Sequence, residues 1–435
     1  MQELELAKKV LDDIIDGGTP FNEALRKVFQ PDESIRPLRP LVAALVGCEL
    51  RHHLLFRELL SHYEGLSEEE KRYLSLGLAD IFFVRRIAKE EMVNALSEAI
   101  GLEKLSAFEA LFAQSEVPGV LMPENLSKSG NKYLSLRYNA PEWVLKIWSH
   151  YGFGTMYKIL KKNNRPGPQT VRVRLSKTSA DAVIGNSVDF SKAPVEGMLF
   201  YNGKTPLRKL EEFRRGNLFL ERMLTKELLD KYRIHEPFEL FCYDGNEDGS
   251  VLKEIIETYG KEIGLNLGVP SLDSHADVTA MLRRDGLKNV NFFAAKPDCL
   301  ESAISKPQDL VIACPNSTKF ELVREEPDFL LHFKKDEMDA LFEQEKAVLD
   351  GCAKYVAEDG TLIYMIYTIS KKEGHQTIAS FLSNNPEFKI VEERQAFPFE
   401  ETDTAMYYAV MKKGKKEEAE AANAATSEMP AKEGE

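Results

Sequence analysis

The residues that could carry chemistry lie after four short apolar runs in the second half of the chain. These runs end at Phe241, Asp273, Ala313 and Tyr367, and stretches with a helical pattern separate them. Short apolar runs that alternate with helices predict a parallel, doubly wound sheet. Ligands bind such sheets outside the carboxyl ends of the strands, so the loops after these runs form the candidate site.

Cysteine and histidine usage argues against a metal site and against a disulfide framework. The five cysteines, Cys48, Cys242, Cys299, Cys314 and Cys352, are odd in number and form no CxxC pair. The eight histidines show no metal-ligand spacing. We therefore expect neither a bound metal nor structural disulfides.

The distribution of charge points to a candidate nucleic-acid contact. The net charge of -13, taken alone, argues against nucleic-acid binding, because phosphate contacts need clustered Lys and Arg. Residues 143–180, however, contain eight Lys or Arg and no acid. The candidate RNA contacts there are Lys158, Lys161, Lys162, Arg165, Arg172, Arg174 and Lys177. The alternative is structural: Lys161 and Lys162 would favour a helix C-terminus, and Arg172 and Arg174 would form the solvated face of an edge strand.

The elements that must position these residues fall into three regions and a tail. Residues 1–125 have apolar positions three and four apart, which predicts a helical bundle. Residues 126–214 mix helices with a strand near 170–177, where Val or Leu alternates with Arg or Lys, the pattern of a half-buried strand. Residues 215–412 carry the alternating strands and helices, with an antiparallel strand added at the end. The tail, 413–435, has almost no large apolar residues and should be disordered.

No apolar run approaches the roughly 18 residues that a membrane span needs. The chain starts with a charged amphipathic helix rather than a signal peptide. We therefore expect a cytoplasmic protein without membrane contact, and a monomer.

In these features the chain resembles the RsmB-type (Sun/NOL/NOP) ribosomal RNA cytosine-C5 methyltransferases up to about residue 412. The residues that carry the resemblance are Pro141, Trp143, Tyr151, Gly152, Asn163, Asn164, and the Arg-x-x-Pro-Asp set Arg324, Pro327 and Asp328. The resemblance implies a NusB-like helical RNA-binding domain over 1–125. It also implies a linker with a small α+β (ferredoxin-like) RNA-binding subdomain over 126–214, and a Rossmann-like class I methyltransferase domain over 215–412.

The resemblance also locates the family's two cysteines, and neither is present. In the family one thiolate attacks carbon 6 of cytosine, which makes carbon 5 nucleophilic, and the other assists release. Those positions hold Tyr367 in "YMIYTI" and Asn316 in "ACPNS", and Ala313 stands in place of the family's Asp. Cys314 is two residues from Asn316, a shift of roughly 6–7 Å along a strand. We therefore interpret Cys314 as a buried strand residue in preference to a nucleophile.

The loop that binds S-adenosylmethionine in the family is also altered. It keeps Cys242, Gly245 and Gly249 but lacks the Pro-Gly-Gly-Lys signature, and the usual cationic position falls among Asn246, Glu247 and Asp248. Acidic residues there would repel the carboxylate of the methyl donor. Asp273 falls where the family's ribose-binding carboxylate lies, with turn formation or helix capping as the alternative. Donor binding is thus expected to be weakened or lost.

These losses favour a pseudoenzyme, a catalytically inactive relative that binds ribosomal RNA or associates with the ribosome. One alternative is an active S-adenosylmethionine-dependent ribosomal RNA (cytosine-C5) methyltransferase with a rearranged site that uses Cys314. Another is a protein-interaction scaffold. Strongly salt-dependent RNA affinity separates RNA binding from a scaffold, and turnover separates an enzyme from both.

Overall fold

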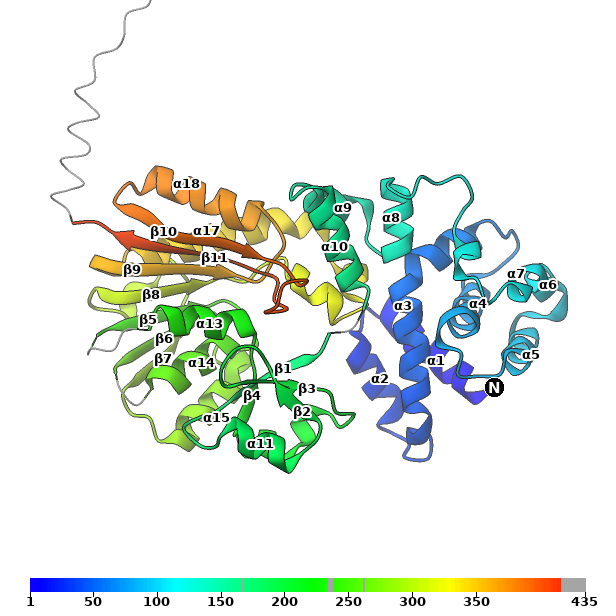
Figure 1. Ribbon diagram of the computed structural model, residues 1–435, viewed down its shortest axis with the longest axis horizontal. Coiled ribbons are helices and arrows are strands. Elements are labelled where there is room, and N and C mark those ends of the chain that lie inside the picture. The colour runs from blue at the N-terminus through cyan, green and yellow to red at the C-terminus, as the bar shows by residue number, and fades with distance from the viewer. Residues whose placement is uncertain (166, 234–237, 261–262, 416–435) are drawn as a thin grey trace, which may run out of the picture. The chain divides into compact units, whose positions relative to one another are not determined.

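The computed structural model describes residues 1–165, 167–233, 238–260 and 263–415 (Figure 1). The chain divides into two compact units, residues 1–166 with 322–334 and residues 167–321 with 335–435. The region predicted as one domain over 126–214 is shared between them, because residues 126–166 belong to the first unit and residues 167–214 to the second. The predicted tail lies outside the described residues from 416 onward.

The first unit is helical, as the apolar spacing predicts. Its helices are α1 (Gln2–Ile15), α2 (Phe21–Phe29), α3 (Arg39–Ser61), α4 (Glu68–Ala79), α5 (Lys89–Ile100), α6 (Leu102–Ser106), α7 (Glu109–Ala113), α8 (Asn131–Tyr138), α9 (Glu142–Ser149), α10 (Phe153–Asn163) and α16 (Phe329–His332). Ser67 and Glu70 form a reciprocal capping box at the start of α4. The apolar faces of α1, α3, α4 and α5 share one core.

The Arg-x-x-Pro-Asp set anchors segment 322–334 within this unit. Arg324 Nε donates to the Arg165 carbonyl at 3.2 Å, and the Asp328 carboxylate accepts the Phe21 N–H at 2.9 Å. Asp328 thereby satisfies a free N–H at the start of α2. These two residues therefore have structural contacts in the first unit, although the chain on both sides of the segment belongs to the second.

The second unit begins with a small antiparallel sheet. Its strands β1 (Gln169–Val173), β2 (Phe190–Lys192), β3 (Met198–Tyr201) and β4 (Leu218–Leu220) lie in the order β2-β3-β1-β4. Helix α11 (Ala180–Asn186) follows β1, and α12 (Glu211–Arg214) precedes β4. This is the β-α-β-β-α-β succession of a ferredoxin-like subdomain.

The larger sheet has the order β10-β11-β9-β8-β5-β6-β7. Its strands are β5 (Leu240–Asp244), β6 (Leu265–Val269), β7 (Val290–Ala294), β8 (Gln308–Cys314), β9 (Val356–Ile366), β10 (Phe388–Ala396) and β11 (Met406–Lys413). Strands β5 to β9 pair in parallel, while β11 pairs antiparallel to β9 and β10, as predicted. The order reverses at β5, which has β6 on one side and β8 on the other.

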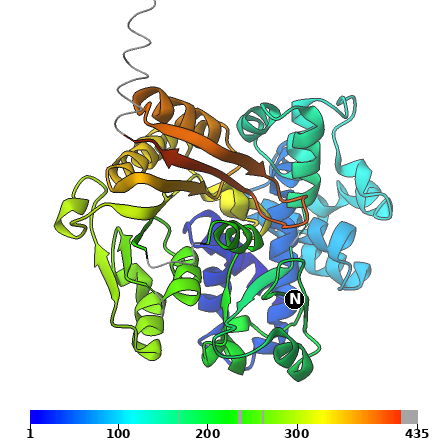
Figure 2. The ribbon, with the colours of Figure 1, turned by 60° about the vertical axis from the view of Figure 1, so that its left-hand side comes forward.

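Helices cover both faces of this sheet (Figures 1 and 2). One layer consists of α13 (Met223–Lys231), α14 (Ser250–Tyr259) and α15 (Ala276–Asp285), and the other of α17 (Met338–Ala353) and α18 (Thr377–Asn384). Alternate residues of the central strands pack into the two cores, Cys242 on one side and Phe241 on the other. Burial of both faces explains why the strands read as continuous apolar runs.

Candidate active site

The loops that follow β5 and β8 meet where the strand order reverses. Asp244 pairs with Cys314 at the ends of the two strands, and the Gly245 N–H donates to the Cys314 carbonyl at 2.7 Å. A Cβ on Gly245 would lie 2.6 Å from the backbone nitrogen of Asn316, so this close approach requires glycine. Two of the predicted site segments are therefore in direct backbone contact.

Asn246 is buried between these two loops. Its side-chain amide donates to Asp244 Oδ1 at 3.1 Å and to Cys314 Sγ at 3.2 Å. Its backbone carbonyl lies 2.8 Å from Nε2 of His275, a buried residue of the loop after β6. His275 could not be predicted from the sequence, because an isolated histidine without spacing to other ligands gives no signal.

Asp244, at the end of β5, and Asp248, in the loop that follows, have pKa values that are shifted in opposite directions. Asp244 is fully buried, and its Oδ2 has no hydrogen-bond partner in the described part of the chain. Burial, followed by the charge of Asp248, raises the pKa of Asp244 to about 6. Burial also acts to raise the pKa of Asp248, but the Arg222 guanidinium at 3.0 Å and hydrogen bonds from Ser250 lower it to about 2. The loop therefore carries a fixed negative charge at neutral pH.

Tyr367, at the position predicted for the missing nucleophile, is buried just beyond the end of β9. Its hydroxyl lies 2.8 Å from Thr225 Oγ1 of α13, and the Arg222 guanidinium lies 3.9 Å from its ring centroid. Burial, followed by the proximity of Cys314, raises the pKa of the phenol well above its usual range. A neutral, hydrogen-bonded phenol in this position packs the end of the sheet and is a poor nucleophile.

Cys314 is fully buried in β8, as the preferred interpretation predicts. Burial, followed by the charge of Asp244, raises the pKa of its thiol well above the usual range. Because the thiolate is the reactive form of cysteine, Cys314 is inert in this environment. Nearby, Asn316 is partly buried, and its Oδ1 has no hydrogen-bond partner among the residues that the structure describes.

A hydrogen-bond network joins the loop after β8 to the loop after β9. The Glu373 carboxylate accepts the Thr318 N–H and the hydroxyls of Thr318 and Thr368, each at 2.7 Å. Glu345 of α17 contacts the same carboxylate, and burial followed by the charge of Glu373 raises the pKa of Glu345 to about 10. Glu345 is thus protonated at neutral pH, and neither of its buried oxygens has a hydrogen-bond partner among the described residues. The segments that carry Asn316 and Tyr367 are held together by buried polar groups.

The remaining cofactor candidates lie in different environments. Asp273 is exposed at the start of a short 3-10 turn, Asp273–His275. Gly249 has a φ of 57° at the entry to α14, where a Cβ would lie 2.7 Å from the Val278 side chain. Cys242 corrects a prediction: it is fully buried in the core beneath α13 to α15, so its thiol does not face the loop. Successive side chains of a strand point to opposite faces of the sheet, and the Cys242 side chain points into this core.

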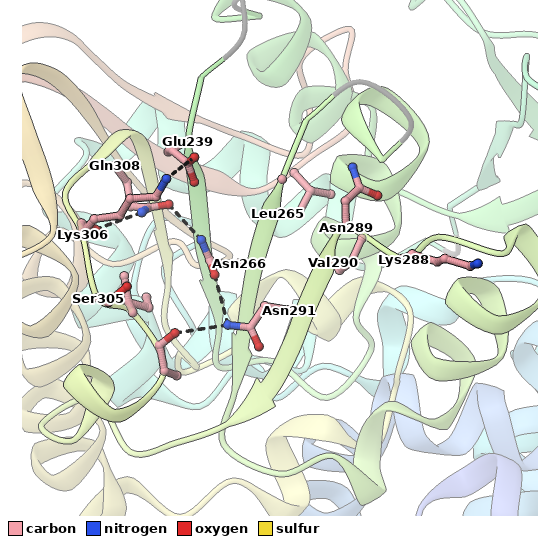
Figure 3. Close-up of a pocket in the computed structure, with 13 residues that line it drawn as sticks. Glu239, Leu265, Asn266, Lys288, Asn289, Val290, Asn291, Ser305, Lys306 and Gln308 are labelled. Carbon is pink, nitrogen blue, oxygen red and sulfur yellow. Dashed lines mark hydrogen bonds and ion pairs between the residues drawn. The ribbon is translucent and has the colours of Figure 1, made fainter.

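A cavity of about 310 Å³ lies at the amino ends of β6, β7 and β8, the opposite edge of the sheet from the predicted cofactor loops (Figure 3). Side-chain amides cross it in a chain: Asn291 donates to Asn266 at 3.1 Å, Asn266 donates to Gln308 at 3.1 Å, and Gln308 donates to the Lys306 carbonyl at 2.9 Å. The chain satisfies the buried Gln308 amide. This cavity is therefore separate from the candidate active site.

Four of the predicted RNA contacts lie on or next to one helix of the first unit. Lys158, Lys161 and Lys162 belong to α10, and Arg165 follows its end. Lys158, Lys161 and Arg165 are exposed, and Lys162 is partly exposed. Lys177 lies in the second unit, where it forms an ion pair with Asp285 at 2.9 Å.

Arg172 and Arg174 do not face solvent, and β1 is not an edge strand, in contrast to the interpretation offered for them. The two side chains are 4% and 3% exposed. Arg172 pairs with Glu254 at 2.9 Å, and Arg174 pairs with Glu257 at 2.7 Å and Asp285 at 2.5 Å. The polar face of β1 is covered by the acidic residues of α14 and α15, so the guanidinium groups are occupied within the protein. We remove both arginines from the RNA-contact set.

Within the described residues, no helix is long and apolar enough to cross a membrane. In the same residues, no group of three or more His, Cys, Asp or Glu is placed to hold a metal ion. All five cysteines are free thiols.

No family model matches the sequence. The chain is 22% identical over 395 residues, 85% of each protein, to the probable ribosomal RNA small subunit methyltransferase B of Bacillus subtilis. It is 29% identical over 308 residues to ribosomal RNA small subunit methyltransferase B of Vibrio cholerae, which covers 67% of this chain and 69% of that one.

Among solved structures, the protein PH0851 superposes with a TM-score of 0.73 at 16% identity, over 94% of this chain and 99% of that one. NSun6 from Pyrococcus horikoshii, determined with SFG, superposes with a TM-score of 0.55 at 12% identity, over 63% of this chain and 98% of that one. The second unit therefore has the Rossmann-like fold of the Sun/NOP methyltransferases. By sequence, the chain is similar to the RsmB-type ribosomal RNA methyltransferases.

Proposed function

We propose that this chain binds ribosomal RNA and transfers no methyl group. The observation that carries the proposal is the state of the two thiol positions: Tyr367 is a buried, hydrogen-bonded phenol, and Asn316 has no nucleophilic group. The nearby thiol, Cys314, is buried and protonated. Attack on carbon 6 of a cytosine needs an accessible thiolate, and neither loop presents one.

Binding of S-adenosylmethionine is proposed to be weakened. When bound, this cofactor supplies an electrophilic methyl group. Asp273 is exposed and can accept from a ribose hydroxyl, and Gly245 permits close approach of the backbone. Against this, the Asn246 side chain occupies the space between the two loops, and ionised Asp248 stands close to the family's cationic position. These residues fit the cofactor poorly.

RNA contact is proposed for the basic face of α10 in the helical first unit, which we infer to be NusB-like. Lys158, Lys161 and Arg165 are exposed on an otherwise acidic protein. The relatives named above are ribosomal RNA methyltransferases, which supports ribosomal RNA as the partner. A cytoplasmic location and a monomeric state are proposals of the same kind.

A second candidate function is methyl transfer through a rearranged site. It is favoured by the position of Cys314 at the end of β8, with its sulfur 3.2 Å from the Asn246 amide and Asp244 beside it. Opening of this contact would expose a thiol next to a carboxylate whose pKa is raised to about 6. Turnover that depends on Cys314 would establish this candidate.

The test of RNA binding is the salt dependence of affinity for small-subunit ribosomal RNA fragments. Replacing Lys158 and Lys161 with Ala removes two phosphate contacts. The slope of log affinity against log salt concentration should flatten by about 1.4 for single-stranded segments. The matched control replaces two exposed lysines of the same unit, Lys9 and Lys128, and should leave the slope unchanged. Equal slopes for both double variants would contradict RNA contact at α10, and an absence of RNA binding would favour the scaffold.

A further inference from the structure

Helix α10 carries two exposed aromatic rings among its lysines. Phe153 is 53% exposed and Tyr157 is 37% exposed. They lie four residues apart, so they share one face of the helix. Met156, Ile159 and Leu160, on the adjoining face of the helix, are buried in the first unit. The exposed parts of the two rings therefore do not contribute to the core of the first unit. Their exposure needs another explanation.

The two rings are arranged as one surface. Their planes differ by 10° and their centroids lie 6.2 Å apart, so the rings are nearly parallel and offset. The Lys161 ammonium lies 5.5 Å from the centroid of Tyr157, one turn further along the same face. Phe153, Tyr157 and Lys161 form what we call the α10 platform.

Neighbouring residues fix the platform in place. The Tyr138 ring of α8 meets Tyr157 edge to face at 5.9 Å. Gly152, with a φ of 87°, starts α10 abruptly, so Phe153 occupies the first turn, where its side chain can extend from the helix. A ring that is already held in position loses little conformational entropy when a flat ligand stacks on it.

We propose that the α10 platform stacks unpaired bases of single-stranded RNA, with the adjacent lysines on the phosphates. This proposal rests on the proposed function and specifies the RNA that the site recognises. The chemistry is complementary: every base has a flat π face that stacks on an aromatic ring, and Lys158 and Lys161 supply positive charge beside it. A duplex keeps its bases stacked inside, so it offers phosphates to the lysines but no base to the rings. The tryptophans of the preceding helix contribute elsewhere, because Trp148 is fully buried and Trp143 stacks on Phe333.

The experiment measures the affinity of the full-length chain for an unstructured RNA oligonucleotide and for the same sequence paired with its complement. Phe153→Ala and Tyr157→Ala should each weaken binding of the single strand by about fivefold or more. Neither change removes a charge, so the salt slope should stay as in the wild type. Binding of the duplex should be unaffected.

Conservative and control variants separate stacking from loss of structure. Tyr157→Phe keeps the ring and should bind like the wild type, while Tyr157→Leu keeps an apolar side chain without the ring and should bind like Tyr157→Ala. Leu102, 68% exposed in the same unit, provides the control for removal of an exposed apolar side chain, and Leu102→Ala should have no effect. A 2-aminopurine base in the oligonucleotide should lose fluorescence on binding to the wild type and less so with Tyr157→Ala.

The possible results distinguish failure of the platform from failure of the proposed function. If Lys158 and Lys161 variants weaken binding but the ring variants do not, RNA binding stands and the platform is refuted. Equal loss for single strand and duplex would also refute base stacking. If the wild type binds neither the single strand nor the duplex at low salt, both the proposed function and the α10 platform are refuted. This result is also expected if the rings contact another protein and not RNA.

Discussion

At the scale of single residues, the carboxyl groups of Glu345 and Glu373 are both buried and interact with each other. Burial, followed by the charge of Glu373, raises the pKa of Glu345 from its ordinary 4.5 to about 10. Such a group takes up a proton when the chain folds. Its contribution to stability is complete below its unfolded pKa near 4.5 and is lost as the pH rises towards about 10.

Glu345→Gln should remove this dependence, because the amide keeps the shape of the carboxyl group and does not titrate. The wild type should lose up to about 1.4 kcal/mol of unfolding free energy per pH unit through this group between about pH 5 and about pH 9. The variant should have a flatter profile and a higher melting temperature at the alkaline end. Thermal unfolding measured across this pH range tests the predicted difference between the two profiles. Glu343, exposed on the same helix, provides the control variant Glu343→Gln. Parallel profiles for wild type and Glu345→Gln would show that Glu345 is already ionised.

The residues of the candidate site could be predicted from the sequence only in part. The functional positions of Tyr367 and Asn316 are predicted by the family resemblance, and both residues follow strands that have a strong apolar pattern. The contacts that determine their chemistry did not follow. Thr225, whose hydroxyl meets Tyr367, is 142 positions away in the chain, and no local pattern relates the two.

At the scale of elements, β1 shows where periodicity misleads. Alternation of Val with Arg correctly predicts a strand with two different faces. The alternation does not predict whether the polar face is exposed to solvent. In this protein the carboxylates of α14 and α15 cover that face. The fold of the large sheet was more predictable, because strands buried on both faces have continuous apolar runs whatever their neighbours are.

Arg174→Ala tests this arrangement. The change leaves Glu257 and Asp285 as buried carboxylates without their guanidinium partner, so the unfolding free energy should fall by about 3–5 kcal/mol. Lys177→Ala removes a more exposed partner of Asp285 and should cost only about 0–1 kcal/mol. Urea unfolding measures both. Because Arg174 is not available to phosphate, the salt slope of RNA binding by a still-folded Arg174→Ala protein should match the wild type, and a flatter slope would return Arg174 to the RNA-contact set.

At the scale of the whole molecule, the chain divides into a helical unit and a unit with the Rossmann-like fold of the Sun/NOP methyltransferases. The boundary of the first unit could not be predicted, because segment 322–334 returns to that unit from a distant part of the sequence. Only tertiary contacts such as the Asp328 carboxylate with the Phe21 N–H reveal it. In the second unit, buried side chains, among them Cys314 and Tyr367, pack the ends of β8 and β9.

The most direct test of this account is methyl transfer from labelled S-adenosylmethionine to small-subunit ribosomal RNA, measured with protein that has been shown to bind that RNA. The account predicts no incorporation above background for the wild type, and the same result for Cys314→Ser. Incorporation by the wild type that is lost in Cys314→Ser would contradict it, because a working thiolate would then exist at the end of β8.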